Sequence, residues 1–80
     1  MNVVRVFVNG IGMEIPREST ALDAVAFADR AEAEEVAAGR RMITDSRGLA
    51  VPPRSEVFAG AIFRTARNKG VGTGDLGLGE

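Results

Sequence analysis

The residues whose type and spacing could do chemistry are three neighbouring glutamates and a glycine-rich C-terminus. The chain has no cysteine and no histidine, so it lacks a thiolate, an imidazole proton shuttle and a Ser/His or Cys/His nucleophile pair. Glu32, Glu34 and Glu35 have no loop that would wrap oxygen ligands around a hard cation, and we interpret them as a solvated helix face. We therefore expect no enzyme, no cofactor and no metal.

The C-terminal stretch "NKGVGTGDLGLGE" covers residues 68–80. A phosphate-binding loop would need a lysine after its glycines and a helix directly behind it, and this stretch has neither. We interpret residues 68–80 as a flexible tail behind a single domain over residues 1–67, because a chain of this length supports one core at most. A tail that acts through its C-terminus is the alternative.

Charge is distributed unevenly along the chain, although the net charge is only −1. Residues 1–39 carry three arginines against seven acidic residues, which gives −4, and residues 40–80 carry seven basic against four acidic residues, which gives +3. Nine of the ten basic residues are arginine, the side chain suited to carboxylates and phosphates. We favour an ordinary soluble surface, with an acidic partner as the alternative.

Nothing in the sequence points to a membrane. No stretch approaches the roughly 20 apolar residues that a spanning helix needs. The N-terminus leads directly into an alternating pattern instead of a basic region and an apolar run, so no signal peptide is visible. We expect a cytoplasmic protein.

The segment "VVRVFVNGIGMEIP" predicts a β-hairpin. Asn9-Gly10 is the preferred pair for a two-residue type I′ turn, which needs positive φ at both positions. This turn sets a register in which three apolar pairs share one side: Val8 with Ile11, Val6 with Met13, and Val4 with Ile15. The opposite side then pairs Phe7 with Gly12 and Arg5 with Glu14. Because a one-residue slip would turn the apolar set to solvent, pattern and turn support each other.

The next segment, "STALDAVAFADRAEAEEVAAG", predicts a helix over about 21–38, with an interruption near Asp29-Arg30 as the alternative. Thr20 and Asp23 have the spacing of a capping box, and Ser19 is the competing cap. Gly39 suits the position after the helix. The expected apolar stripe is Leu22, Val25, Ala26 and Val36. Phe27 falls beside this stripe; we expect it to pack against a loop, and a binding role is the alternative.

The second half predicts another hairpin and a final strand. In "RRMITDSRGLAV", Asp45 opens and Gly48 closes a type I turn, and Pro52-Pro53 ends the strand. "RSEVFAG" connects, with a turn near Gly60. "AIFRTAR" is apolar on both sides at its start, which is typical of a central strand.

The order hairpin, helix, hairpin, strand predicts an α+β fold. We expect a mixed sheet of four to five strands with one main helix packed on one face. The last strand should lie beside the first and parallel to it, because the helix and second hairpin supply the crossover.

Two segments, "VFVNGIGMEIPRESTALDA" and "ITDSRGLAVPPRSEVFAGAIFRTA", resemble the ubiquitin-like β-grasp superfamily. The pattern is most similar to the small bacterial branch of sulfur-carrier proteins of thiamine and molybdopterin synthesis and of TGS domains. The resemblance covers roughly residues 3–67 and implies the β-grasp fold. It implies little about function, since the fold hosts carriers, modifiers, RNA-associated modules and interaction domains.

The resemblance to the carriers would place chemistry in the tail. In that family a C-terminal Gly-Gly carboxylate is activated with ATP by a separate adenylating enzyme. This chain departs from the pattern, since it has no Gly-Gly and ends in Gly77, Leu78, Gly79 and Glu80. These four residues are the candidate activated tail. The intact mass of protein from its own host would reveal a truncated, thiocarboxylated or conjugated carrier.

The first hypothesis is instead a non-enzymatic interaction domain that docks a protein through the open sheet face. The candidate docking residues are Phe7, Phe63, Arg64, Arg40 and Arg41, with Arg67 nearby. Few aromatic residues and a near-neutral charge argue against nucleic acid as the partner. We expect a monomer or a weak homodimer.

Overall fold

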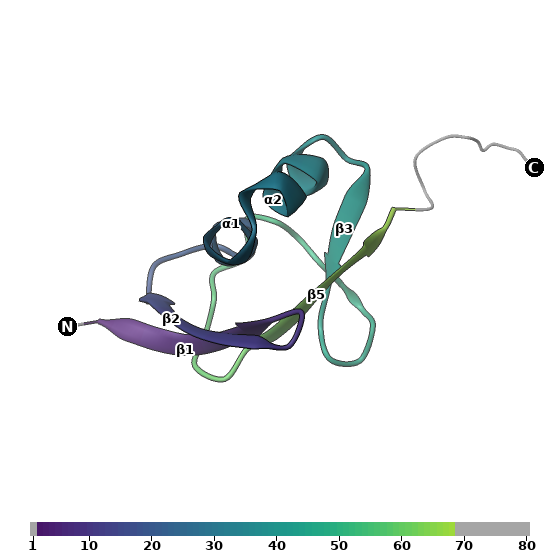
Figure 1. Cartoon of the computed structure of the whole chain (residues 1–80). Coiled ribbons are helices and arrows are strands. Elements are labelled where there is room, and N and C mark those ends of the chain that lie inside the picture. The colour runs from purple at the N-terminus through teal and green to yellow at the C-terminus, as the bar shows by residue number, and fades with distance from the viewer. Residues whose placement is uncertain (1, 69–80) are drawn as a thin grey trace, which may run out of the picture.

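The computed structural model describes residues 2–68 as a mixed β-sheet with two helices on one of its faces (Figure 1). The elements are β1 (Val3–Val8), β2 (Ile11–Pro16), α1 (Ala21–Ala28), α2 (Arg30–Ala37), β3 (Arg41–Thr44), β4 (Ala50–Val51) and β5 (Ile62–Arg67). The predicted α+β class is confirmed. Neither helix in this part of the chain is long and apolar enough to cross a membrane.

The five strands lie in the order β2-β1-β5-β3-β4. Strand β5 is central and parallel to β1, as the sequence predicted, and it is antiparallel to β3. Parallel neighbours cannot be joined by a tight turn. The chain between them therefore passes through both helices and the second hairpin before it returns to the middle of the sheet.

The first hairpin has the predicted register in all five predicted pairs, and a sixth pair, Val3 with Pro16, continues it. Its turn residues have positive φ, 50° at Asn9 and 87° at Gly10. The inner-facing residues Val4, Val6, Val8 and Ile15 are buried. Ile11 is 58% exposed, because it lies on the edge strand directly beside the turn.

Asn9 also extends the parallel pairing of β1 with β5. The ladder runs from the Phe7 N–H to the Ala61 carbonyl and from the Asn9 N–H to the Phe63 carbonyl, both at 2.9 Å. Strand β1 ends there, and the Asn9 side chain continues the ladder. Its Oδ1 accepts from the Thr65 N–H, and its Nδ2 donates to Thr65 Oγ1, both at 3.1 Å.

Helix α1 begins at the predicted capping box. Thr20 Oγ1 accepts from the Asp23 N–H at 3.1 Å, and Asp23 Oδ2 accepts from the Thr20 N–H at 3.0 Å. The two bonds satisfy donors that the first turn of a helix leaves unpaired, a contribution of about 1 kcal/mol. Ser19, the competing cap, is buried instead.

Two helices replace the single main helix of the prediction, and the interruption lies where the alternative placed it. Asp29 is extended, with φ −162° and ψ 105°. It ends α1 and caps α2, since its Oδ1 accepts from the Glu32 N–H at 3.2 Å. Gly39, with φ 85°, follows α2 as predicted.

The core lies between the helices and the inner face of the sheet. Val25 and Val36 of the predicted stripe are buried, and Leu22 is partly buried. Ala26 is exposed, so its place on the stripe was wrong. Small side chains fill buried helix positions and let the helices approach the sheet closely: Ala21, Ala24 and Ala33.

The β3–β4 turn also follows the prediction. The Gly48 N–H donates to the Asp45 carbonyl at 3.0 Å, and Gly48 has φ 81°. Asp45 Oδ1 accepts from the backbone N–H groups of Leu49 at 2.9 Å and Arg47 at 2.8 Å. These bonds hold the pKa of Asp45 below its ordinary value, and the bond from the Leu49 N–H has the largest effect. The Arg47 N–H and the positive charge of Arg47 lower it further. The predicted turn near Gly60 is present, with φ 86°.

Candidate functional site

The outer face of the sheet, away from α1 and α2, carries the candidate site (Figure 1). Within residues 2–68, no helix covers this face. Side chains alternate along a strand, so Arg5 and Phe7 of β1 point outward between the buried valines. In the register, Phe7 lies between Gly12 of β2 and Ile62 of β5.

Phe7 is held in place by its neighbours and is half-buried. Its ring lies over Gly12, where an added Cβ would be 3.1 Å from Phe7 Cε2. The Arg5 guanidinium stands 5.8 Å from the ring centroid, within the range of a cation–π contact. Arg5 also pairs with Glu14 at 3.9 Å, as the hairpin register predicted. A fixed aromatic ring beside charged groups is suited to protein contacts.

Phe63 does not belong to this face, and its prediction as a docking residue was wrong. It is the register partner of buried Val8 and only 3% of its surface is exposed. Its neighbour Ile62 takes the outer position instead, opposite Phe7, and is 42% exposed. Because both residues are apolar, the sequence pattern of β5 does not tell which one faces inward.

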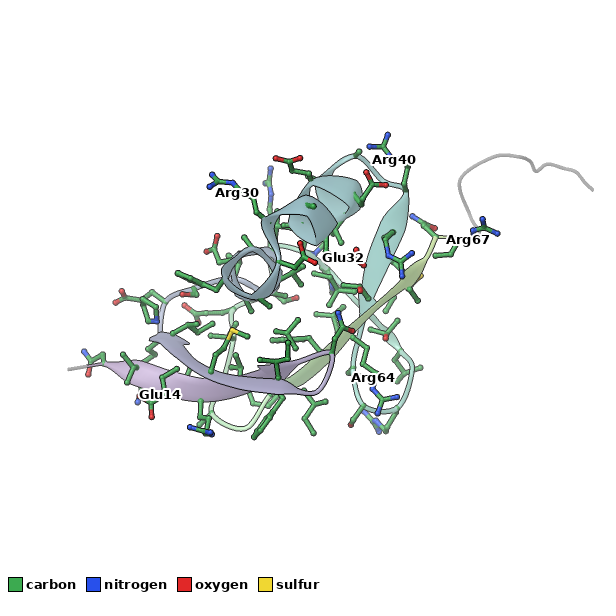
Figure 2. All side chains as sticks on the ribbon, viewed as in Figure 1. Glu14, Arg30, Glu32, Arg40, Arg64 and Arg67 are labelled. Atoms are coloured by element: carbon green, nitrogen blue, oxygen red, sulfur yellow. The ribbon has the colours of Figure 1, made fainter. Side chains whose placement is uncertain are left out.

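Among the predicted docking arginines, Arg64 lies on the outer face. It is two residues after Ile62 on the same strand, so both side chains share one side, and it is exposed. Figure 2 shows Arg64 and Glu14 on the side of the sheet away from the helices. Arg40 and Arg67 lie elsewhere, at the end of the sheet near α2.

Arg40 and Arg41 do not join the site. Arg41 lies two positions before buried Ile43 on β3, so both side chains are on the inner side of the strand. Its register partner is Arg67, and it forms an ion pair with Glu32 of α2. Arg40 follows α2 and pairs with Glu35. Long charged side chains reach a helix partner as readily as a sheet face, and spacing alone does not show which.

The Arg40–Glu35 pair has two parallel bonds, 2.8 Å from Nε and 2.9 Å from Nη2. Hydrogen bonding to Arg40 lowers the pKa of Glu35, and the same bond raises the pKa of Arg40. Both side chains are solvent-exposed, so the pair contributes little to stability. It leaves Arg40 with a partner inside the chain.

We name the remaining set the outer patch: Arg5, Phe7, Glu14, Ile62 and Arg64. It combines two exposed or half-exposed apolar side chains with arginines of both neighbouring central strands. Arg5 is paired with Glu14, whereas no ion pair of Arg64 is found within residues 2–68. The patch can therefore contact an apolar side chain and a carboxylate together. The sequence predicted the pairing of Arg5 with Glu14, but Arg5, Glu14 and Ile62 were not among the predicted docking residues.

A hollow of about 440 Å³ adjoins the outer patch at Ile62. It lies between the β3–β4 turn, β4, the connecting segment 52–61 and the start of β5. Its apolar lining includes Pro52, Phe58 and Ile62, and its polar lining includes Arg47 and Glu56. We call it the β5 hollow.

The other sequence candidates do not form a second site. Phe27 is 61% exposed and does not pack into a loop as expected. In the described part of the chain, no group of three acidic side chains is placed to hold a metal ion. The candidate activated tail, Gly77 to Glu80, lies outside the described residues.

No family model matches the sequence, and no curated protein is significantly similar to it.

Proposed function

We propose that this protein is a non-catalytic, ubiquitin-like interaction domain that binds a protein partner through the outer patch. The β-grasp assignment is supported by three features together. These are the strand order β2-β1-β5-β3-β4, the parallel pairing of the first and last strands, and a helical layer on one face only.

The observation that carries the proposal is the pairing of Phe7 with Ile62 on the outer face, with the charged side chains of Arg5, Glu14 and Arg64 on the same face. Ile62 is 42% exposed although it sits on the central strand. An apolar centre with a polar rim is the arrangement found in protein interfaces. Arg64 at the rim has no ion-pair partner in residues 2–68, so a partner's carboxylate can pair with it.

The test is capture of a partner by the full chain from its own host after photo-crosslinking from the outer patch. A crosslinker at position 14 would label what docks there, and the labelled protein is identified by mass spectrometry. We expect Ile62→Ser and Arg64→Glu each to abolish the labelled product. The matched control is Arg67→Glu, which has the same charge change on the same strand but on the other face.

The result that would reject the proposal is a labelled product that survives both outer-patch substitutions while amide NMR spectra show that the variants are folded. Loss of labelling with Arg67→Glu as well would indicate that net charge alone matters. Intact mass on the same material would separate this function from that of a carrier, whose C-terminus would be truncated, thiocarboxylated or conjugated.

A further inference from the structure

We propose that the β5 hollow binds an extended acidic segment of the partner, with an apolar side chain in the hollow and carboxylates on Arg47 and Arg64. This inference rests on the proposed function and names the chemistry of the partner.

The backbone at the hollow is open on one side. Strand β5 directs the carbonyls of Ala61 and Phe63 toward β1, so the N–H and C=O of Ile62 point the other way. There β3 has already ended, since its last pair with β5 is Thr44 with Arg64. If the register continued, Ser46 would face Ile62, but Ser46 belongs to the turn. No backbone hydrogen bond of the described turn reaches Ile62. An extended peptide can therefore pair with Ile62 where a strand is missing.

The lining of the hollow favours an apolar side chain in this peptide. Phe58 and Ile62 line it, and they are 65% and 42% exposed. The volume of about 440 Å³ is that of an ordinary ligand pocket and exceeds what one leucine or phenylalanine side chain needs. Covering these two side chains removes apolar surface from water, which favours binding.

The charges favour acidic residues on either side of that apolar residue. Arg47 lines the hollow from the turn, and Arg64 follows Ile62 on the outer face. The nearby Asp45 carboxylate is occupied by the Arg47 and Leu49 N–H groups. Glu56 is the one carboxylate in the lining that no described bond occupies. Its backbone pairs with Thr20 before α1, on a segment separate from both arginines.

The test begins with a phage library of random 12-residue peptides, selected on the full immobilised chain. We expect enrichment of sequences in which a leucine, isoleucine, methionine or phenylalanine is flanked by aspartate or glutamate. The best peptide is then synthesised and titrated into the isotope-labelled protein. Amide shifts should be largest at residues 46–47 and 62–64.

Matched variants complete the test. Arg47→Glu and Arg64→Glu should each weaken the peptide about tenfold, because reversal replaces an attraction with a repulsion. Arg67→Glu should change the dissociation constant less than about twofold, since it lies on the other face. Glu56→Gln should tighten binding. Ile62→Pro, which removes the open N–H, should abolish it; Ile62→Val keeps the N–H and should bind.

No enrichment, enrichment of basic peptides, or equal effects of Arg64→Glu and Arg67→Glu would overturn the inference. So would self-association of the chain with no peptide bound. If shifts fall on Phe7 and Arg5 but not on the hollow, this inference fails and the proposed function stands. The proposed function is rejected by a different result, namely the absence of a labelled product after crosslinking from the outer patch.

Discussion

Ile62 and Phe63 are neighbours in β5, and the sheet places them on opposite faces. Phe63 is 3% exposed and belongs to the buried core, whereas Ile62 is 42% exposed beside Phe7. The inner face gains its free energy during folding, because its apolar surface is removed from water. On the outer face, the exposed apolar surface would be removed from water only when a partner binds. The two faces therefore predict different responses to the same substitution.

The largest expected effect is from Phe63→Ala. Truncating a buried phenylalanine costs about 3–5 kcal/mol, which is most of the stability of a domain this small. Urea unfolding followed by circular dichroism measures it. Phe63→Leu should lose less and stay folded, so it gives a value even if the alanine variant is unfolded.

Ile62→Ala is the matched outer-face change, and we expect it to alter the free energy of unfolding by about 0.5 kcal/mol or less. A loss as large as that of Phe63→Ala would contradict the assignment of the two faces.

Asn9 links the first turn to β5 at the end of β1, and substitutions there separate its turn conformation from its side-chain hydrogen bonds. Asn9→Gly keeps the positive φ and loses both bonds to Thr65, and we expect a loss of about 1 kcal/mol. Asn9→Ala loses the conformation as well, so its loss should be larger. Equal losses in the two variants would show that the turn conformation contributes nothing.

Asp45 predicts how acid acts on the β3–β4 turn beside the hollow. The folded state lowers the pKa of this carboxyl. Its contribution to stability is therefore present above the ordinary pKa and is lost as pH falls through the folded value. Asp45→Asn should be less stable than the parent at pH 7, and the difference should shrink toward pH 2. Urea midpoints at both pH values measure it, and a difference that grows in acid would contradict the assignment.

Gly12→Ala should also have only a small effect on stability. The added methyl would meet the Phe7 ring at 3.1 Å and Arg5 Nη2 at 3.2 Å, and both atoms belong to side chains that can move. We expect a change within about 0.5 kcal/mol, and displaced Phe7 ring resonances in NMR spectra. Unchanged ring shifts would show that the ring does not lie over Gly12. The same variant should reduce the yield of partner crosslinking although its free energy of unfolding stays nearly unchanged.

The local features of the fold could be predicted from the sequence because each depends on residues a few positions apart. Asn9-Gly10 determines a turn and with it the whole first register. Thr20 with Asp23 determines a cap, and Asp45 with Gly48 a second turn. Even the end of α1 at Asp29 was among the sequence alternatives, since this residue type competes with helix hydrogen bonds.

The candidate site depended on pairings between distant segments, and there the sequence was insufficient. Which of Ile62 and Phe63 faces outward is decided by the register of β5 against β1, and two adjacent apolar residues fit either choice. Arg41 forms an ion pair with Glu32 of α2, although its position in the sequence was equally compatible with the outer face. Local hydrogen bonds select backbone conformation within one turn or cap, whereas the assignment of a side chain to a face requires a strand or helix brought alongside by the whole chain.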